Sequence, residues 1–111
     1  MRWIQLAMFS PLMRNHTALG TRMQEVYQFD HMDRFRDILG LRYGMLPYIY
    51  SEYMKAALRG EMYFTPLSFV YTEDEFAPQV EDQLLVGDSL MIAPVYSQNA
   101  EGRYVLSAGG D

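Results

Sequence analysis

The chain has 111 residues, half of them hydrophobic, with a net charge of −5 and no cysteine. This length suits one domain that buries about two thirds of its unfolded surface. The missing cysteine excludes disulfides and thiolate metal sites. The acidic charge and the scattered basic residues argue against a nucleic-acid partner.

Targeting signals are not evident in the sequence. No apolar run approaches the roughly 20 residues that a membrane span needs. The N-terminal residues Met1–Gln5 do not begin a secretory signal peptide. We therefore expect a cytoplasmic protein that does not contact a membrane.

The first predicted elements are a helical end, a buried strand and a polar cluster. Arg2–Ala7 has helical spacing, but a helix starting there would have no N-cap. Met8–Met13 is an apolar run of strand length, and Pro11 makes this strand short or irregular. Arg14–His16 follows directly and should lie at the exposed end of the strand. Thr17–Gln28 reads as a long loop.

Asp33–Leu58 is the clearest predicted helix, because apolar side chains recur on one face. The apolar stripe comprises Phe35, Ile38, Leu39, Leu46, Ile49, Tyr50, Tyr53 and Ala57. Asp30 is the expected N-cap, and Arg59–Gly60 supplies a C-terminal charge and a left-handed stop. Pro47 removes one hydrogen bond and should kink the helix or split it near Gly44.

After Gly60 the pattern changes from helical to β, and we place a domain boundary there. In a sequence, strands are recognised as short apolar runs that are bounded by turn residues. The predicted segments are a strand at Tyr63–Tyr71, an acidic loop at Thr72–Pro78, a short helix at Val80–Val86 ended by Gly87, a buried strand at Leu90–Val95, a turn at Gln98–Gly102, the beginning of a strand at Arg103–Leu106 and a loose tail at Ala108–Asp111.

Arg14 and His16 form the most informative polar cluster. Two residues apart on an extended segment, their side chains point the same way. A guanidinium fork beside an imidazole can bind a ligand that carries hydroxyl or carboxylate groups. In the alternative interpretation, Arg14 pairs with a structural carboxylate and His16 caps a turn. Spacing alone favours this alternative.

Other polar residues indicate no reaction centre. With only His16 and His31 available, carboxylates would have to supply most ligands of a zinc site, so we expect neither metal nor cofactor. His31 reads as a solvated first-turn residue of the long helix. Glycosidases need a pair of carboxylates flanking the scissile bond, but nothing places an acidic pair in an apolar pocket here. The acidic residues in question are Glu73, Asp74, Glu75, Glu81 and Asp82.

Three segments in order resemble glycoside hydrolase family 31. They are Arg2–His16 (RWIQLAMFSPLMRNH), Leu41–Tyr50 (LRYGMLPYIY) and Asp82–Val95 (DQLLVGDSLMIAPV). The resemblance implies an α/β fold, with residues 1–60 forming the last strand–helix unit of a (β/α)8 barrel. Residues 61–111 would begin the β-sandwich that follows. Family members hydrolyse α-linked glycosides with retention, mostly α-glucosides or α-xylosides.

The resemblance also assigns roles to the polar cluster. His16 matches the family histidine that hydrogen-bonds sugar hydroxyls next to the scissile bond, and Arg14 matches the arginine that organises this pocket. No residue matches either catalytic aspartate of the family, so we expect no catalytic residue in this chain and no activity of the chain alone. The implied partner, in the parent enzyme, is an α-linked glucoside or oligosaccharide.

Several positions depart from the family pattern. Thr65 stands where many members have arginine, and Val26–Tyr27 replaces a common Pro-Trp pair. The family pattern breaks off at both ends, which indicates a truncation. An alternative function follows: a truncated remnant that acts as a small, non-catalytic, self-associating interaction protein. Apolar surface that once packed on a barrel would then be exposed and favour a homo-oligomer.

Overall fold

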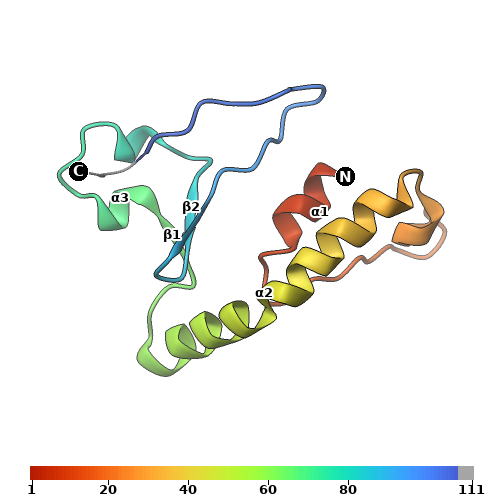
Figure 1. Cartoon of the computed structure of the whole chain (residues 1–111), viewed down its shortest axis with the longest axis horizontal. Helices are drawn as coiled ribbons and strands as arrows, with labels where there is room; N and C mark the ends of the chain where they lie inside the picture. The colour runs from red at the N-terminus through yellow and green to blue at the C-terminus, as the bar shows by residue number, and fades with distance from the viewer. Residues whose placement is uncertain (108–111) are drawn as a thin grey trace.

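The computed structural model describes residues 1–107, so the loose tail predicted for residues 108–111 lies outside the described residues. The helices are α1 (Arg2–Ala7), α2 (Met32–Arg59) and α3 (Leu67–Val70), with 3₁₀ turns η1 (Val26–Gln28) and η2 (Ala77–Gln79). The strands are β1 (Phe64–Pro66), β2 (Leu84–Val86) and β3 (Leu90–Ile92). In Figure 1, α2 is the longest element, and α1 lies beside its first half. None of the helices in residues 1–107 is both long and apolar enough to cross a membrane.

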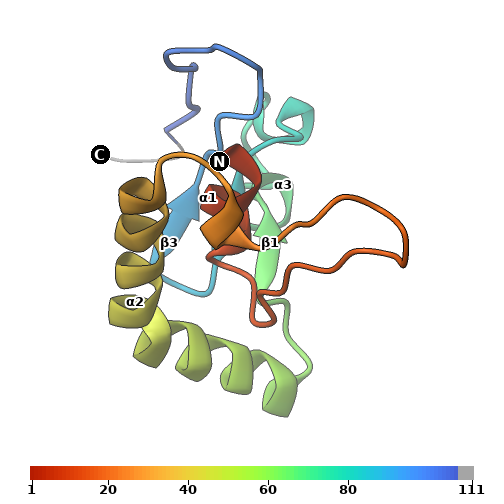
Figure 2. The ribbon, with the colours of Figure 1, turned by 90° about the vertical axis from the view of Figure 1, so that its right-hand side faces the viewer.

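Helix α2 confirms the strongest sequence prediction, but its N-cap and part of its apolar stripe differ from what was expected. Four residues of the predicted stripe are exposed: Leu46, Tyr50, Tyr53 and Ala57. The helix begins after His31, which adopts a left-handed conformation with φ 66°, so the predicted N-cap at Asp30 is wrong. It ends at Gly60, whose φ of 68° provides the predicted left-handed stop. Pro47 lies inside an unbroken helix, and the ribbon changes direction partway along α2 (Figures 1 and 2). The predicted kink is therefore present, whereas a split is not.

The buried face of α2 has a seven-residue spacing. Phe35, Ile49 and Ala56 are 4%, 3% and 6% exposed, respectively. Two turns of a helix take about seven residues, so these side chains lie on one face. Ile49 and Ala56 belong to the main core cluster, together with Tyr63, Val86 and Ile92 from the β segment. The core therefore joins the second half of α2 to the sheet.

The sheet is antiparallel, in the order β1-β2-β3. Phe64 pairs with Val86, and Val86 pairs with Leu90. Residues 87–89 therefore form a tight turn between β2 and β3. Gly87 has φ 61°, and a Cβ atom there would overlap the side chain of Glu52 from α2. The hairpin turn thus lies directly against the helix.

Two predictions in the β segment are wrong in type. Val80–Val86 is not a helix, because Leu84–Val86 pairs as a central strand with both neighbours. Tyr63–Tyr71 is a strand only at Phe64–Pro66, after which the chain turns into α3 and buries Leu67 completely. The strand predicted at Leu90–Val95 is present but ends at Ile92.

Two further predicted strands do not form. Met8–Met13 makes turns and bends, and Arg103–Leu106 is irregular. Neither segment has a neighbouring strand with which to form a ladder within residues 1–107. Backbone N–H and C=O groups that do not pair in a ladder need other hydrogen-bond partners. In these two segments, side chains provide such partners. The contacts made by residues 8–11 hold the segment that leads into the candidate site.

Candidate functional site

The turn after α1 is held by side chains from later in the chain. Arg42 of α2 donates hydrogen bonds to the carbonyl oxygens of Met8, Ser10 (2.8 Å) and Pro11 (3.2 Å). The Tyr63 hydroxyl donates to the carbonyl oxygen of Phe9 at 2.6 Å. Burial raises the pKa of the Tyr63 hydroxyl, so the group stays protonated well into the alkaline range. The segment leading to Arg14 is therefore anchored to both α2 and the β segment.

Arg14 and His16 are brought together, as the sequence predicts. Both are exposed, and an Arg14 Nη atom lies 3.2 Å from His16 Nδ1. A guanidinium can only donate hydrogen bonds, so Nδ1 must be the acceptor. The proton of the neutral imidazole then lies on Nε2. No ion pair between Arg14 and a carboxylate occurs within residues 1–107.

The loop after His16 is closed by polar side chains. Asn15 Nδ2 donates to the carbonyl oxygen of Gln24 at 2.8 Å, which ties the two ends of the loop together. Thr17 donates to the carbonyl oxygen of Arg22 at 3.2 Å, and Thr21 donates to that of Ala18 at 2.8 Å. Figure 2 shows this loop extending away from the helices. Its conformation is thus set by its own hydrogen bonds.

The acidic residues have structural partners or are exposed. Asp74 accepts hydrogen bonds from the backbone N–H groups of Phe76 (2.7 Å) and Ala77 (3.1 Å), and so caps η2. Asp82 binds Arg103, and this guanidinium lowers the pKa of the Asp82 carboxyl. Glu73, Glu75 and Glu81 are exposed. None of these acidic side chains joins Arg14 and His16 in a reaction centre.

One carboxylate oxygen was not anticipated. Oε2 of Glu25, just after the loop, is buried and has no hydrogen-bond partner within residues 1–107. A buried, unpaired polar atom is costly and needs a partner. His31, in contrast, is exposed at the start of α2, as its sequence position predicts.

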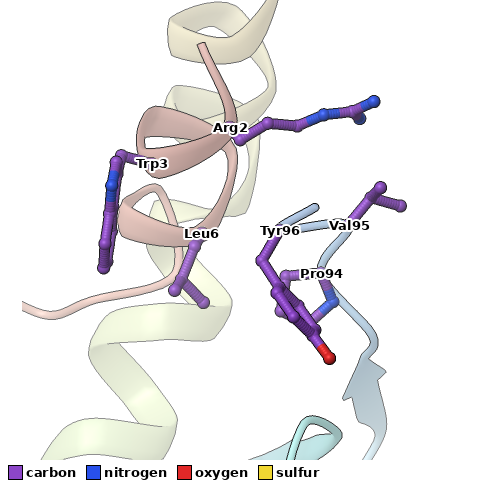
Figure 3. A pocket seen from close by; sticks show the side chains of 6 residues that line it. All are labelled: Arg2, Trp3, Leu6, Pro94, Val95 and Tyr96. Atoms are coloured by element: carbon purple, nitrogen blue, oxygen red, sulfur yellow. The ribbon is translucent and has the colours of Figure 1, made fainter. Parts of the chain in front are cut away.

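An apolar groove lies apart from the polar cluster. It has a volume of about 410 Å³ and lies between α1 and the segment after β3. Figure 3 shows Leu6 facing Pro94 and Tyr96 across it, with Arg2 at one end. Neither Arg14 nor His16 lines this groove. Its lining lacks the clustered polar groups that would orient a sugar.

Sequence reasoning missed Arg42 and Tyr63. The signal for Arg42 was present, because it lies seven residues after Phe35 and seven before Ile49 on the buried stripe. A charged residue on an apolar helix face requires polar partners in the interior. Nothing in the sequence identified those partners as carbonyl groups of residues 8–11. Tyr63 has no comparable signal.

Comparison with known families gives two matches in succession. Residues 1–52 match the family model described as "Glycosyl hydrolases family 31 TIM-barrel domain". Residues 60–110 match the model described as "Glycosyl hydrolase family 31 C-terminal domain". Residues 53–59, at the end of α2, lie between the two matches.

Individual proteins similar to this chain are alpha-glucosidases. The lysosomal alpha-glucosidase of Bos taurus is 43% identical over 96 residues, which is 85% of this chain and 10% of that protein. Alpha-glucosidase 2 of Bacillus thermoamyloliquefaciens is 36% identical over 99% of this chain and 14% of its own length. This chain thus spans only about a tenth of the length of the curated relatives.

A solved structure has the same arrangement of elements. It is a family 31 dextranase from Flavobacterium johnsoniae, a variant complexed with isomaltotriose, with a TM-score of 0.77 and 30% identity. The similarity covers 89% of this chain and 12% of the dextranase chain. On the two domain matches, the relatives and this structure, the chain belongs to glycoside hydrolase family 31.

Proposed function

We propose that this chain supplies sugar-binding residues to a retaining α-glycoside hydrolase that acts on α-glucosides or related glycosides. In this proposal residues 1–60 complete a (β/α)8 catalytic barrel, and residues 61–111 begin the following β-sandwich. His16 donates a hydrogen bond to a sugar hydroxyl, and Arg14 organises the pocket around it. Related alpha-glucosidases and the dextranase with isomaltotriose support the substrate class.

One observation carries the proposal: the geometry of the Arg14–His16 pair. Because His16 Nδ1 accepts from Arg14, the Nε2–H group is left as a donor on an exposed segment. Sugar hydroxyls accept such hydrogen bonds. A site built to bind a hydroxyl discriminates strongly, because its polar group is otherwise left unpaired.

The reaction itself needs groups other than these. Retaining glycosidases use two carboxyl groups about 5 Å apart, one as nucleophile and one as acid/base. No residue of this chain matches either catalytic aspartate of the family, and Asp82 and Asp88 form ion pairs with Arg103 and Lys55. We therefore expect the purified 111-residue chain not to hydrolyse an α-glucoside. Turnover that persists after contaminating host glucosidases are removed would contradict this expectation.

Sugar binding is tested by titrating the ¹⁵N-labelled chain with isomaltotriose and following amide and ring signals by NMR. We expect saturable shifts at residues 14–16, and a loss of about tenfold in affinity in His16→Gln, which corresponds to one hydrogen bond of about 1.4 kcal/mol. His31→Gln is the matched control, since His31 is the other exposed histidine. The absence of any saturable shift at residues 14–16 in the unsubstituted chain would refute the binding role.

Self-association as a small non-catalytic protein is a second candidate function. It is favoured by large apolar side chains that are more than three-quarters exposed. These are Trp3 (82%), Leu12 (78%), Leu19 (105%), Leu58 (81%) and Tyr104 (100%). A monomeric protein rarely leaves so many large apolar groups in water if they form a contiguous patch.

A further inference from the structure

We infer that Arg42 is a positioning residue for the His16 site. From α2 it holds the backbone that carries Arg14 and His16, and thereby fixes the hydrogen bond between their side chains. The inference rests on the proposed sugar-binding role of His16.

The first step concerns four consecutive carbonyl groups. Arg42 binds the carbonyls of Met8, Ser10 and Pro11, and Tyr63 binds that of Phe9. The planar guanidinium carries five N–H donors in a fixed fork, so one side chain can hold several carbonyls in a single arrangement. Hydrogen bonds from a charged donor are stronger than those between neutral groups. The two side chains thus replace the strand ladder that this segment lacks.

The second step links these carbonyls to Arg14. Only Leu12 and Met13 separate Pro11 from Arg14. Leu12 is 78% exposed, so apolar packing does not fix the backbone at that position. On the far side, Asn15 is tied to the carbonyl of Gln24. Arg14 therefore lies between two anchor points, and Arg42 provides the one before it.

The third step is the Arg14–His16 contact. The 3.2 Å separation of Arg14 Nη and His16 Nδ1 is that of a long hydrogen bond, which a small backbone shift would break. If residues 12–14 move, His16 Nδ1 loses its donor and the ring can rotate. The orientation of the Nε2–H group then ceases to be fixed. Arg42 thus acts on His16 through the backbone and Arg14, without touching the sugar itself.

The test measures the ring nitrogens of His16 by ¹⁵N NMR on the full chain, at about pH 8, above the usual histidine range near 6.5. In Arg42→Met the Nδ1 signal should move towards that of a ring without a donor, and isomaltotriose affinity should fall about tenfold. Arg42→Lys keeps the charge but loses the fork, and should give a smaller change. Arg36→Met is the matched control on α2, since Arg36 is exposed and forms an ion pair with Asp33, at 3.7 Å, on its own helix.

Each outcome decides the question. An unchanged His16 Nδ1 signal in folded Arg42→Met overturns the inference, whatever happens to sugar binding. If Arg42→Met does not fold, Arg42→Lys decides by the same signal: a shift supports the inference, and an unchanged signal overturns it. If the unsubstituted chain does not bind isomaltotriose, the proposed function fails, while the ring signal still reports on Arg42.

Discussion

Gly87 lies where the β2–β3 turn meets helix α2, and two constraints exclude a side chain there. Its φ of 61° is left-handed, and a Cβ atom would overlap Glu52. Left-handed backbone costs a residue with a Cβ about 1–2 kcal/mol, and overpacking costs about 1–3 kcal/mol. We therefore expect Gly87→Ala to lower the free energy of unfolding by about 2–4 kcal/mol, measured by urea denaturation.

Two other glycines separate these contributions. Gly60 shares the positive φ, at 68°, but has open space around it, so Gly60→Ala should cost only about 1–2 kcal/mol. Gly102 has neither constraint, and Gly102→Ala should be neutral or slightly stabilising. Equal losses at Gly87 and Gly60 would show that the Glu52 side chain moves aside without cost.

Asp82 gives the last segment a dependence on pH. Its hydrogen bond with Arg103 lowers the pKa of the folded carboxyl below the unfolded value near 3.9. A lowered folded pKa means that the unfolded state binds more protons, so the stability from this pair is present above about pH 4 and is lost as the pH falls through the folded pKa. We expect Asp82→Asn to flatten the acid limb of a stability–pH curve. An identical acid limb in Asp82→Asn and the unsubstituted chain would show that other carboxyl groups cause it.

At the residue level, the sequence is enough to predict that Arg14 and His16 form a polar cluster. It is not enough to predict which side chains hold the backbone of that cluster in place. Arg14 and His16 come together because both lie within three consecutive residues, and local spacing is readable. Their anchors are Arg42, which is 31 to 34 residues away from the carbonyls that it binds, and Tyr63, which is 54 residues away from its carbonyl. Such long-range partners follow from the packing of α2 on the sheet, which a local pattern does not contain.

Among the elements, length decides how much of the structure could be predicted. Helix α2 has 28 residues, so its periodicity, C-terminal glycine and internal proline all carry information. Each strand has only three residues, too few for an alternating pattern to be distinguished from a helical one. For this reason the pattern at β2 predicts a helix, and Gly87, expected to end that helix, lies instead in the β2–β3 turn.

The last irregular segment is attached to the sheet by one buried side chain. Gln83 is 2% exposed, and its amide donates to the carbonyl of Leu106 (3.0 Å) and accepts from the N–H of Leu106 (2.8 Å). The side chain thus pairs with Leu106 as a neighbouring strand would. An amide is required, because it donates and accepts at once.

We expect Gln83→Leu to keep the volume but leave both backbone groups of Leu106 without partners. The loss should be about 1–3 kcal/mol, and the Leu106 amide should exchange with solvent much faster. Hydrogen exchange followed by NMR measures both effects. Gln79→Leu is the control, since Gln79 is exposed and its amide binds the nearby carbonyl of Glu75. Unchanged protection of Leu106 in Gln83→Leu would show that other contacts hold the segment.

The whole molecule is more open than its length predicts. The radius of gyration is 16.1 Å, and the extents are 48 × 36 × 27 Å. A compact domain of this length would have a radius of gyration of about 13 Å. In an extended shape the apolar faces of α1 and α2 have less of the chain to pack against. The exposure of Trp3 at 82% is a direct consequence.

Trp3 provides the test of self-association, because it is the only tryptophan in the chain and lines the apolar groove beside α1. If copies associate through this face, Trp3 loses contact with water, so its fluorescence should shift to shorter wavelength as the protein concentration rises. Sedimentation should show a matching increase in mass. Trp3→Gln should weaken the association by about 1.5–3 kcal/mol per buried side chain.

Leu58→Gln tests the far end of α2, where an equally exposed side chain lies away from the groove. If the α1 face carries the contact, this substitution leaves the mass distribution unchanged, whereas Trp3→Gln shifts it towards monomer. A strictly monomeric chain at high concentration, with Trp3 emission typical of full exposure, would exclude the self-associating function. Because that result says nothing against sugar binding at His16, the two candidate functions can be separated on the same protein.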